Sequence, residues 1–497
     1  MPKFVILWTD GAIWLLIAAL VAYTVTVLRK PQLAANWAKV FRDAAALSSS
    51  LVLVLCLLVT LLDSVHYRPR LPPAPTATGA ANAAPAYESR TRSLLDEALW
   101  GLIQSRESTY SRPLSYLGFT KESLIVNGQA QRVAPRLQFG GKHLTDPATQ
   151  WLGDVAAKAA KGAVLDALFA LLLSAALLLA ISRAQRLPLA QVWTQVRARS
   201  TPVPWHVALA TVWVLCLLVG MAATLSGPYH LLGTDLTGND VLFQSLKSIR
   251  TAFVIGTLAT VATLPLAVTL GLLAGYFRGW VDELIQYLYT VLSSVPNVLL
   301  IAACVLMVQV FLDKNPDLFE TGAERADLKL FLLCVVLGVT GWAGLCRLLR
   351  GETMKLRELD YVQAASAFGV SHTRILVRHI FPNVAHLMLI VTVLEFSSLI
   401  LYEAVLSYVG VGVDPSMNSF GGMINLARKE MSRDPVVWWS FAAAFGFMVT
   451  LVLAANLFAD GVRDAFDPRA RAFKRRRTSS RAASGAASKA APKAEAA

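Results

Sequence analysis

The chain has 497 residues, of which 55% are hydrophobic and only 16% are charged, with a mean hydropathy of +0.53. A soluble domain typically carries about a quarter charged residues, so this composition excludes an ordinary soluble protein of this length. The net charge of +14 does not indicate a nucleic-acid-binding protein, because the basic residues lie beside apolar blocks and in the C-terminal tail.

Five cysteines lie inside apolar blocks, and none forms a Cys-x-x-Cys pair. This placement is typical of small buried hydrophobic residues rather than of metal ligands or disulfides. The five are Cys56, Cys216, Cys304, Cys334 and Cys346.

Two apolar blocks open the chain, at residues 4–28 and 44–62, and each approaches the length that crosses a bilayer. Basic residues lie between them: Arg29, Lys30, Lys39 and Arg42. Such a flank stays in the cytoplasm. Because the basic residues follow the first block, this block is predicted to be an uncleaved span and not a signal peptide. Asp10 is an unusual charge within it.

An insert at residues 63–162 separates the second apolar block from the third. It opens with a Pro/Ala-rich linker over 72–85 that has no core-forming residues. Apolar residues at helical spacing predict an amphipathic helix over 93–105. A β-branched run at 124–126 before Asn-Gly at 127–128 predicts a hairpin with a type I′ turn. We therefore expect a small extracytoplasmic α+β domain.

A third apolar block at 164–181 returns to the cytoplasm and ends in an arginine-rich stretch. Six more blocks follow, at residues 205–225, 252–276, 285–311, 330–349, 385–409 and 437–459. Alternation of sides places the loop 351–383 and the C-terminus in the cytoplasm, and both are strongly basic, as the positive-inside rule requires. The tail after Arg471 is rich in Arg, Lys, Ser and Ala and is predicted to be disordered.

Two prolines, Pro265 and Pro296, are predicted to interrupt spans. A proline frees a carbonyl and bends the helix, and such positions usually face other helices or a water-filled path. A packed kink without a role in transport is the alternative for either proline.

The most informative segment is the loop 361–383. Small residues such as Ala364 lie on a predicted short helix, and Gly369 is where that helix stops or turns sharply. A basic stretch with Arg378 and then Pro382 lead into the next span. Small side chains on an exposed helix let another protein approach closely, so this geometry suits transmission of force from a partner. Taken alone, the pattern is also compatible with an ordinary loop helix.

The loop resembles the Glu-Ala-Ala (EAA) motif of permease subunits of binding-protein-dependent ABC importers. In that motif Glu-Ala-Ala is followed by three residues, Gly, and Pro thirteen residues later. Ala364, Ala365, Gly369 and Pro382 hold this spacing, and Gln363 stands where the motif has Glu. The glutamine keeps hydrogen-bonding capacity but lacks the charge for a salt bridge. In the family, this helix docks into a cleft of the ATP-hydrolysing subunit.

Further segments resemble the dipeptide/oligopeptide-type permeases. They are His-Leu-Leu-Gly-Thr-Asp-Leu-Thr-Gly-Asn-Asp-Val at 230–241, Gly-Tyr-Phe-Arg-Gly-Trp-Val-Asp at 275–282, Glu-Ala-Val-Leu-Ser-Tyr-Val-Gly-Val-Gly at 403–412 and Asp-Ala-Phe-Asp-Pro-Arg at 464–469. The motifs occur in the expected order across residues 205–469. The first two hundred residues fall outside the resemblance.

The resemblance implies an all-α polytopic membrane protein, an ABC importer type I permease with a MetI-like core of six helices. About three extra N-terminal spans and the small α+β insert precede that core. The expected domains are two spans at 1–62, the insert at 63–162, a third span and linker at 163–204, the permease core at 205–469 and a basic tail at 470–497.

The resemblance also implies the partners: a second homologous permease, two ABC ATPase subunits, an extracytoplasmic solute-binding protein and the lipid bilayer of a bacterial inner membrane. This chain has no Gly-x-x-x-x-Gly-Lys-Ser/Thr phosphate loop. We therefore expect a transport subunit and not an enzyme, with no cofactor of its own and with ATP bound by the partners. Peptides are the expected solutes, although nickel and other small solutes use similar permeases.

Glu395 and Glu403 are the conspicuous carboxylates within the spans. Ionisable groups inside a membrane usually face a bundle interior or water, so these residues and Pro296 are candidates for lining the translocation path. A carboxyl group that holds two helices together is the alternative for Glu403.

Thr234, Asp235 and Asp240 are expected at the extracytoplasmic mouth of the path. Thr234 and Asp235 lie between glycines, which favours a tight turn over a ligand site. His230 is expected to be a hydrogen-bonded turn residue, since no second His or Cys lies at metal-ligand spacing.

Two other classes of function are weighed against this hypothesis. A stand-alone secondary transporter would show an inverted repeat and charged residues at the membrane midplane, and the sequence shows no convincing repeat. A membrane-embedded enzyme would need a converging set such as His-Glu-x-x-His, which is absent from the sequence.

Overall fold

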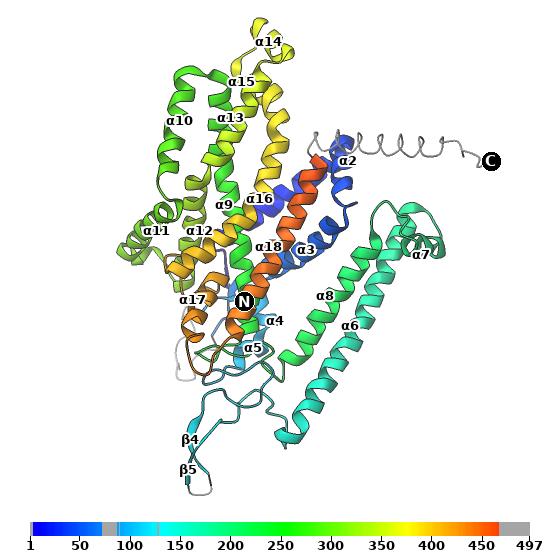
Figure 1. Cartoon of the computed structure of the whole chain (residues 1–497), viewed down its shortest axis with the longest axis vertical. Helices are drawn as coiled ribbons and strands as arrows, with labels where there is room; N and C mark the ends of the chain where they lie inside the picture. The colour runs from blue at the N-terminus through cyan, green and yellow to red at the C-terminus, as the bar shows by residue number, and fades with distance from the viewer. Residues whose placement is uncertain (1–2, 72–86, 89, 127–128, 467–497) are drawn as a thin grey trace, which may run out of the picture.

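The computed structural model describes residues 3–71, 87–88, 90–126 and 129–466. Within these residues, eight helices are long and apolar enough to cross a membrane, and a ninth span is formed by two helices that meet at a bend (Figure 1). The all-α polytopic fold predicted from the sequence is therefore confirmed. The predicted linker at 72–85 and the basic tail at 470–497 lie outside the described residues.

The spans follow one another in chain order with short connecting helices between them. The eight are α1 (Trp8–Arg29), α3 (Ala44–Asp63), α6 (Pro147–Gln185), α8 (Trp205–Ser226), α9 (Val241–Phe277), α11 (Asn297–Lys314), α16 (Phe381–Val409) and α18 (Trp439–Phe466), and the bent pair is α12 (Gly322–Gly341) with α13 (Ala343–Arg357). The connecting helices include α2 (Pro31–Val40), α7 (Leu189–Arg197), α10 (Gly279–Ser294), the 3-10 turn η1 (Pro316–Leu318) and α17 (Phe420–Glu430). Three spans precede α8, as the sequence predicted.

The span predicted at 285–311 is not one helix, because the chain breaks between α10 and α11. Val295 has an extended backbone, with φ −88° and ψ 134°. A residue before proline is disfavoured in helical conformation, and Pro296 follows it. The interruption predicted at Pro296 is therefore confirmed, although the apolar run continues through the break and hydropathy alone predicted one span.

Two other predictions about helix continuity are corrected by the structure. Pro265 lies inside the continuous helix α9 and does not interrupt it. The block predicted at 330–349 is instead bent by 42° where α12 meets α13.

The insert contains less helix than its apolar spacing predicts. Two short helices, α4 (Leu94–Ala98) and α5 (Trp100–Gln104), replace the single helix over 93–105. Ser93 caps the first: its hydroxyl accepts from the Asp96 N–H, and the Asp96 carboxylate accepts from the Ser93 N–H. This reciprocal pair satisfies two donors at the helix start.

The predicted hairpin is present as β4 (Glu122–Val126) and β5 (Gln129–Val133), which pair antiparallel. Val126 pairs with Gln129. The turn residues 127–128 lie outside the described residues, so the type I′ turn stays a prediction.

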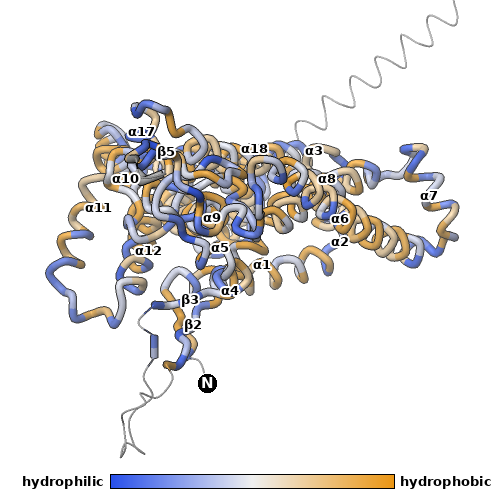
Figure 2. The backbone as a smooth tube through the Cα atoms, turned by 90° about the horizontal axis from the view of Figure 1, so that it is seen from below, coloured by the Kyte–Doolittle hydropathy of each residue, from blue (hydrophilic) through white to orange (hydrophobic). Residues whose placement is uncertain are grey.

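Helix α6 runs without a break across residue 162, where the sequence placed a domain boundary. Its 39 residues extend about 58 Å at 1.5 Å per residue, which exceeds the thickness of the hydrocarbon core. The first turns of α6 therefore belong to the insert, and the rest forms a span. With α7 and α8 it makes an arm that stands away from the other helices (Figures 1 and 2).

A small sheet joins the N-terminus to the insert, and the sequence did not predict it. Strand β1 (Lys3–Val5) pairs with β2 (His66–Arg68), which pairs with β3 (Arg92–Ser93), all antiparallel. The chain therefore enters α1 on the same side on which it leaves α3. This arrangement agrees with a hairpin of two spans whose basic connection lies on the opposite side.

A buried ionic cluster connects the N-terminal spans to the later helices. The Arg250 guanidinium on α9 lies 2.7 Å from Asp10 Oδ1 on α1 and 3.4 Å from Asp327 Oδ1 on α12. It also donates to the Thr9 hydroxyl at 2.8 Å. The three charged residues are at most 4% exposed. Each charge has a partner of opposite sign, which is what permits their burial.

One turn earlier on α9, Lys247 forms a second set of ion pairs. Its Nζ lies 2.6 Å from Asp63 Oδ1 at the end of α3 and 2.7 Å from Asp96 Oδ1 in the insert. The N-terminal spans and the insert thus meet α9 at two successive cations. Ion pairs as well as apolar contacts therefore hold the helices together at this end of the molecule.

Replacing Arg250 by Met should destabilise the protein by about 3–5 kcal/mol, because the Asp327 carboxylate would stay buried without a counter-charge and Asp10 would keep only the imidazole of His66. Thermal unfolding of the purified chain in detergent measures the loss. The exposed pair between Lys3 and Glu320 supplies the control, since Lys3→Ala should cost at most about 1 kcal/mol. Equal, small shifts for both variants would contradict the role assigned to Arg250.

Candidate functional site

The loop singled out in the sequence forms a helical finger at one end of the molecule (Figure 1). Helix α14 (Asp360–Ala367) ends at Gly369, whose φ is +75°. The Gly369 N–H donates to Ser366 O, and the Val370 N–H donates to Ala365 O, at 3.0 and 3.1 Å. These two bonds with a left-handed glycine constitute a Schellman motif. The predicted short helix and its stop at Gly369 are therefore confirmed.

The finger continues directly into a membrane span. Helix α15 (His372–Ile375) passes through one π-helical stretch, η2 (Leu376–Ile380), into α16. Pro382 is the second residue of α16, directly after the π-helical stretch. A displacement of the finger would thus be carried along one helical rod.

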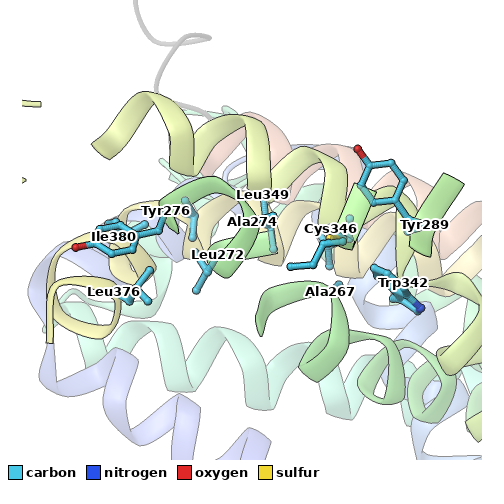
Figure 3. Packing of buried hydrophobic residues seen from close by; sticks show 14 of the residues in the cluster. Ala267, Leu272, Ala274, Tyr276, Tyr289, Trp342, Cys346, Leu349, Leu376 and Ile380 are labelled. Atoms are coloured by element: carbon cyan, nitrogen blue, oxygen red, sulfur yellow. The ribbon is translucent and has the colours of Figure 1, made fainter. Parts of the chain in front are cut away.

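Apolar side chains anchor the finger between α9 and α13. Val362, Ile375 and Ile380 are at most 2% exposed. They share one core with residues of α9, α10 and α13, among them Leu272, Tyr276, Tyr289, Cys346 and Leu349 (Figure 3). Burial of this size makes the base of the finger rigid.

Polar contacts add to this anchor at the end of α9. The Tyr276 hydroxyl lies 2.8 Å from His372 Nδ1, and the Arg357 guanidinium donates to Tyr276 O at 2.6 Å. On the neighbouring helices, Arg350 of α13 and Asp282 of α10 form an ion pair, with Nη2 to Oδ2 at 2.7 Å. Helices α9, α10 and α13 are therefore tied to the base of the finger.

The outer face of the finger is exposed, and several of its side chains are small. Gln363, Ala364, Gly369 and Arg378 are exposed, and the Phe368 ring is 87% exposed. A Cβ built on Gly369 would meet nothing within 4 Å. Ala365 is half-buried at the edge of this face. The face has the small side chains that close contact with another protein requires.

Gln363, which stands where the motif has glutamate, hydrogen-bonds to a residue of its own loop. Gln363 Nε2 donates to the Glu358 carbonyl at 3.2 Å, and Glu358 also pairs with Arg278. A carboxylate is therefore still present beside the first turn of α14, although it comes from position 358.

Glu403 is enclosed within the chain. Its carboxylate is 1% exposed and accepts from the Ser407 hydroxyl at 2.6 Å. The Ser419 hydroxyl and the Gly421 N–H, at the start of α17, also hydrogen-bond to it. This geometry matches the alternative in which the carboxyl group holds two helices together.

Glu395 has a different environment at the centre of α16. Its side chain is exposed, whereas Phe396 packs on Phe253 of α9 and Ser397 donates to Asn456 of α18. Successive helix residues point about 100° apart. Glu395 therefore points away from both neighbouring helices and toward whatever lies outside this chain.

Pro296 lines a hollow of about 520 Å³ between the α10–α11 break and the α12–α13 bend. The polar residues around it come from both interruptions. They are Ser293, Ser294, Asn297 and Thr340.

The segment 230–241 forms a tight turn at the opposite end of the molecule. Asp235 Oδ1 accepts from the N–H groups of Thr237 and Asn239 at 2.8 and 2.9 Å. Asp240 caps α9 by accepting from the Leu242 and Phe243 N–H groups. The predicted turn is confirmed.

Thr234 connects this turn to the insert and to the last span. Its hydroxyl donates to Thr109 O at 2.8 Å and accepts from the Ser111 N–H at 2.6 Å. The Trp439 indole of α18 donates to Thr234 O. Thr234 is fully buried, so it holds the turn against the insert and α18.

Glu107 of the insert completes the turn, and no motif in the sequence points to it. His230 lies 2.8 Å from Asp240 Oδ2 and 3.4 Å from Glu107 Oε1. Glu107 also accepts from the N–H groups of Gln138, Phe139 and Gly140. An acidic residue in an irregular segment has no periodicity to distinguish it, so only the fold brings it to the histidine.

His230, Asp240 and Glu107 form a triad, and the charges of His230 and Glu107 depend on each other. Burial by itself would lower the pKa of His230, but hydrogen bonds to the Asp240 and Glu107 carboxylates outweigh it and raise the pKa to about 9. Burial would likewise raise the pKa of Glu107, yet the bonds from His230 and the backbone lower it to about 2. His230 is therefore an imidazolium at neutral pH.

Comparison with known proteins places these features in a family. The model of the "Binding-protein-dependent transport system inner membrane component" family matches residues 267–472. The oligopeptide transport system permease protein OppC of Mycobacterium bovis is 33% identical over 249 residues, which cover 50% of this chain and 79% of the relative. The chain belongs to the inner-membrane permeases of binding-protein-dependent transport systems.

Other members of the permease family show the same partial coverage of this chain. The glutathione transport system permease protein GsiD of Pectobacterium atrosepticum is 30% identical over 304 residues, covering 55% of this chain and 94% of the relative. The dipeptide transport system permease protein DppC of Lactococcus lactis is 29% identical, covering 48% and 64%. The solved MetNI methionine ABC transporter, in inward-facing conformations, aligns with a TM-score of 0.33 at 15% identity, covering 46% of this chain and 96% of that one.

Membership in the permease family makes this chain a multi-pass inner-membrane protein and a transport subunit rather than an enzyme. The matched relatives leave about half of the chain uncovered. The loop 361–383 lies within the family match, whereas Asp10 and Glu107 do not.

The His230 triad predicts a pH dependence of stability. Because the folded pKa of about 9 exceeds the ordinary value near 6.5, the stabilisation is complete below about pH 6.5 and is lost as pH rises toward 9. The Tm of the wild type should therefore fall across this interval. In His230→Gln the fall should be smaller, with the exposed-residue variant His143→Gln as control. The same pH dependence in His230→Gln would refute the prediction.

The surroundings of Glu403 predict a structural role. Glu403→Gln keeps the shape and one acceptor oxygen, so the transport rate should stay within about twofold of wild type. Glu403→Leu leaves the Ser407, Ser419 and Gly421 donors unpaired and should cost about 1–3 kcal/mol per unsatisfied group. Transport assays and thermal unfolding measure the two effects. A large loss of transport in a stably folded Glu403→Gln protein would instead place this carboxylate in the path.

Proposed function

We propose that this chain is a permease subunit of an ATP-driven importer for oligopeptides, dipeptides or glutathione, and that the loop 361–383 couples it to a separate ATPase. The family assignment supports import through a binding-protein-dependent system. The relatives named as oligopeptide, dipeptide and glutathione permeases support peptides as the solute class.

The observation that carries the coupling role is the finger itself. Its tip exposes Ala364, Phe368 and Gly369, while its base is buried against α9 and α13. A rigid base lets the finger transmit a movement, and small side chains at its tip let another protein bind closely. Force applied to α14 would pass through the Gly369 turn to α15, which continues through η2 into α16.

In this proposal two ATPase subunits hydrolyse ATP outside this chain, and one of them holds the finger. A second, homologous permease completes the pathway, and an extracytoplasmic binding protein delivers the solute. Closure of the ATPases would move Gln363 to Ser371 and switch the cavity from outward-facing to inward-facing. A secondary transporter working alone would leave the exposed finger without a purpose.

The sidedness of the proposal follows from charge and packing. Helix α2, which joins the first two spans, packs through Val40 on Val462 and Phe466 at the end of α18. The basic connection around α2 and the end of α18 therefore lie on one side, which the positive-inside rule makes cytoplasmic. These observations support the proposal that the end of α18 lies on the cytoplasmic side.

Ala364→Asp tests the docking face. The residue is exposed on a helix, so the change should leave the permease folded while the added charge and bulk prevent close contact. The ATPase that co-purifies with the wild-type complex should be reduced at least tenfold. Leu236→Asp, an exposed change in the turn at the opposite end of the molecule, should retain it. Full retention of the ATPase by Ala364→Asp would rule out this docking face.

Gly369→Ala tests the geometry of the finger. A residue with a Cβ is disfavoured at a φ of +75°, at a cost of about 1 kcal/mol. The finger should tilt, so that peptide-stimulated ATP hydrolysis by the assembled complex falls while the Tm changes by only a few degrees. Unchanged stimulation would show that the Schellman geometry is not needed for coupling.

A further inference from the structure

Two spans are interrupted at the same place in the fold. The α10–α11 break at Val295 and the α12–α13 bend at Trp342 both border the 520 Å³ hollow. Backbone that departs from helix at membrane depth is tolerated where it is buried in protein or lines a water-filled cavity. The hollow is open, and Ser293, Pro296 and Asn297 beside it are exposed, so these interruptions fit the second case.

The position of the hollow follows from helix lengths. Helix α11 has 18 residues and α12 has 20, so each extends about 27–30 Å from its interrupted end. That distance matches the hydrocarbon core of a bilayer. The far ends of α11 and α12 are joined through η1, near the ion pairs of Glu320 with Lys3 and Arg68. The hollow therefore lies at the end of the membrane nearest the finger.

The lining of the hollow is polar and uncharged. Hydroxyl groups come from Ser293, Ser294 and Thr340, and Asn297 supplies an amide. The Ser294 and Thr340 hydroxyls donate to carbonyls of their own helices. An asparagine side chain both donates and accepts, as a peptide bond does. The described lining thus offers hydrogen bonds to an amide but no charge for an acidic or basic side chain.

Resting on the proposed function, we infer that this hollow is a solute subsite at the inner end of the path, which binds the peptide backbone through Ser293 and Asn297. Its volume falls in the range of about 300–1,000 Å³ typical of small-molecule sites, which accommodates a di- or tripeptide. Recognition of the amide rather than the side chains makes the subsite tolerant of peptide sequence.

The hollow is also connected to the coupling finger. Ala343, which lines it, is the first residue of α13, and α13 leads directly to α14. The Asp282–Arg350 pair ties α13 to α10, whose last residues form the other wall. A movement of the finger would therefore change the width of the subsite.

Cysteine labelling tests the subsite. Ser294→Cys, which keeps Ser293 and Asn297 in place, is introduced into a variant whose native cysteines are replaced, and the complete complex with its ATPases is reconstituted in nanodiscs. A small maleimide should label this cysteine, and saturating alanyl-alanine should slow labelling at least threefold. Free alanine, which has no peptide bond, should not protect at the same concentration.

Two further variants complete the test. Val295→Cys, at a neighbouring exposed position of the lining, should behave like Ser294→Cys, so that a folding defect in one variant does not decide the outcome. Val310→Cys, exposed near the other end of α11, should show no peptide-dependent change. Absence of labelling at both 294 and 295, or labelling that alanyl-alanine leaves unchanged, would overturn the inference. Loss of ATPase co-purification from wild type would refute the proposed function instead.

Discussion

The guanidinium of Arg250 lies between the carboxylates of Asp10 and Asp327, and α1, α9 and α12 meet in this one buried cluster. Removing charges from water is costly unless each finds a partner, so the three helices cannot separate without a large penalty. The family match begins only at residue 267. The cluster therefore makes the unmatched N-terminal spans part of the same folded unit as the permease core.

The two ends of the molecule differ in how they are held. At the insert end, the Arg250 cluster, the Lys247 pairs and the His230 triad lock helices together through buried charge. At the finger end, the contacts are mostly apolar, and two spans are interrupted beside an open hollow. Because the packed base of the finger moves as one body, we expect motion driven by a partner to reach the interrupted spans beside the hollow.

Hydropathy and turn chemistry predicted most of the elements because these signals are local. The spans, the hairpin, the turn at 230–241 and the finger's stop at Gly369 all follow from apolar runs, Asn-Gly, Asx residues or glycine. Continuity of helices was predicted less well. The break predicted at Pro296 is present, but the bend at Trp342 occurs inside an apolar run, where hydropathy does not change. Pro265 was predicted to interrupt α9 and lies within a continuous helix.

By itself, the sequence determined the membrane class, the number of spans and the exposed finger with its motif, since each depends on residues close together in the chain. Only the tertiary structure decided the partners of buried charges. Asp10 and Arg250, or Glu107 and His230, are far apart in sequence, and no periodic pattern links them. It also decided that Glu403 is enclosed while Glu395 is exposed, because which side of α16 faces other helices depends on how α9 and α18 pack against it.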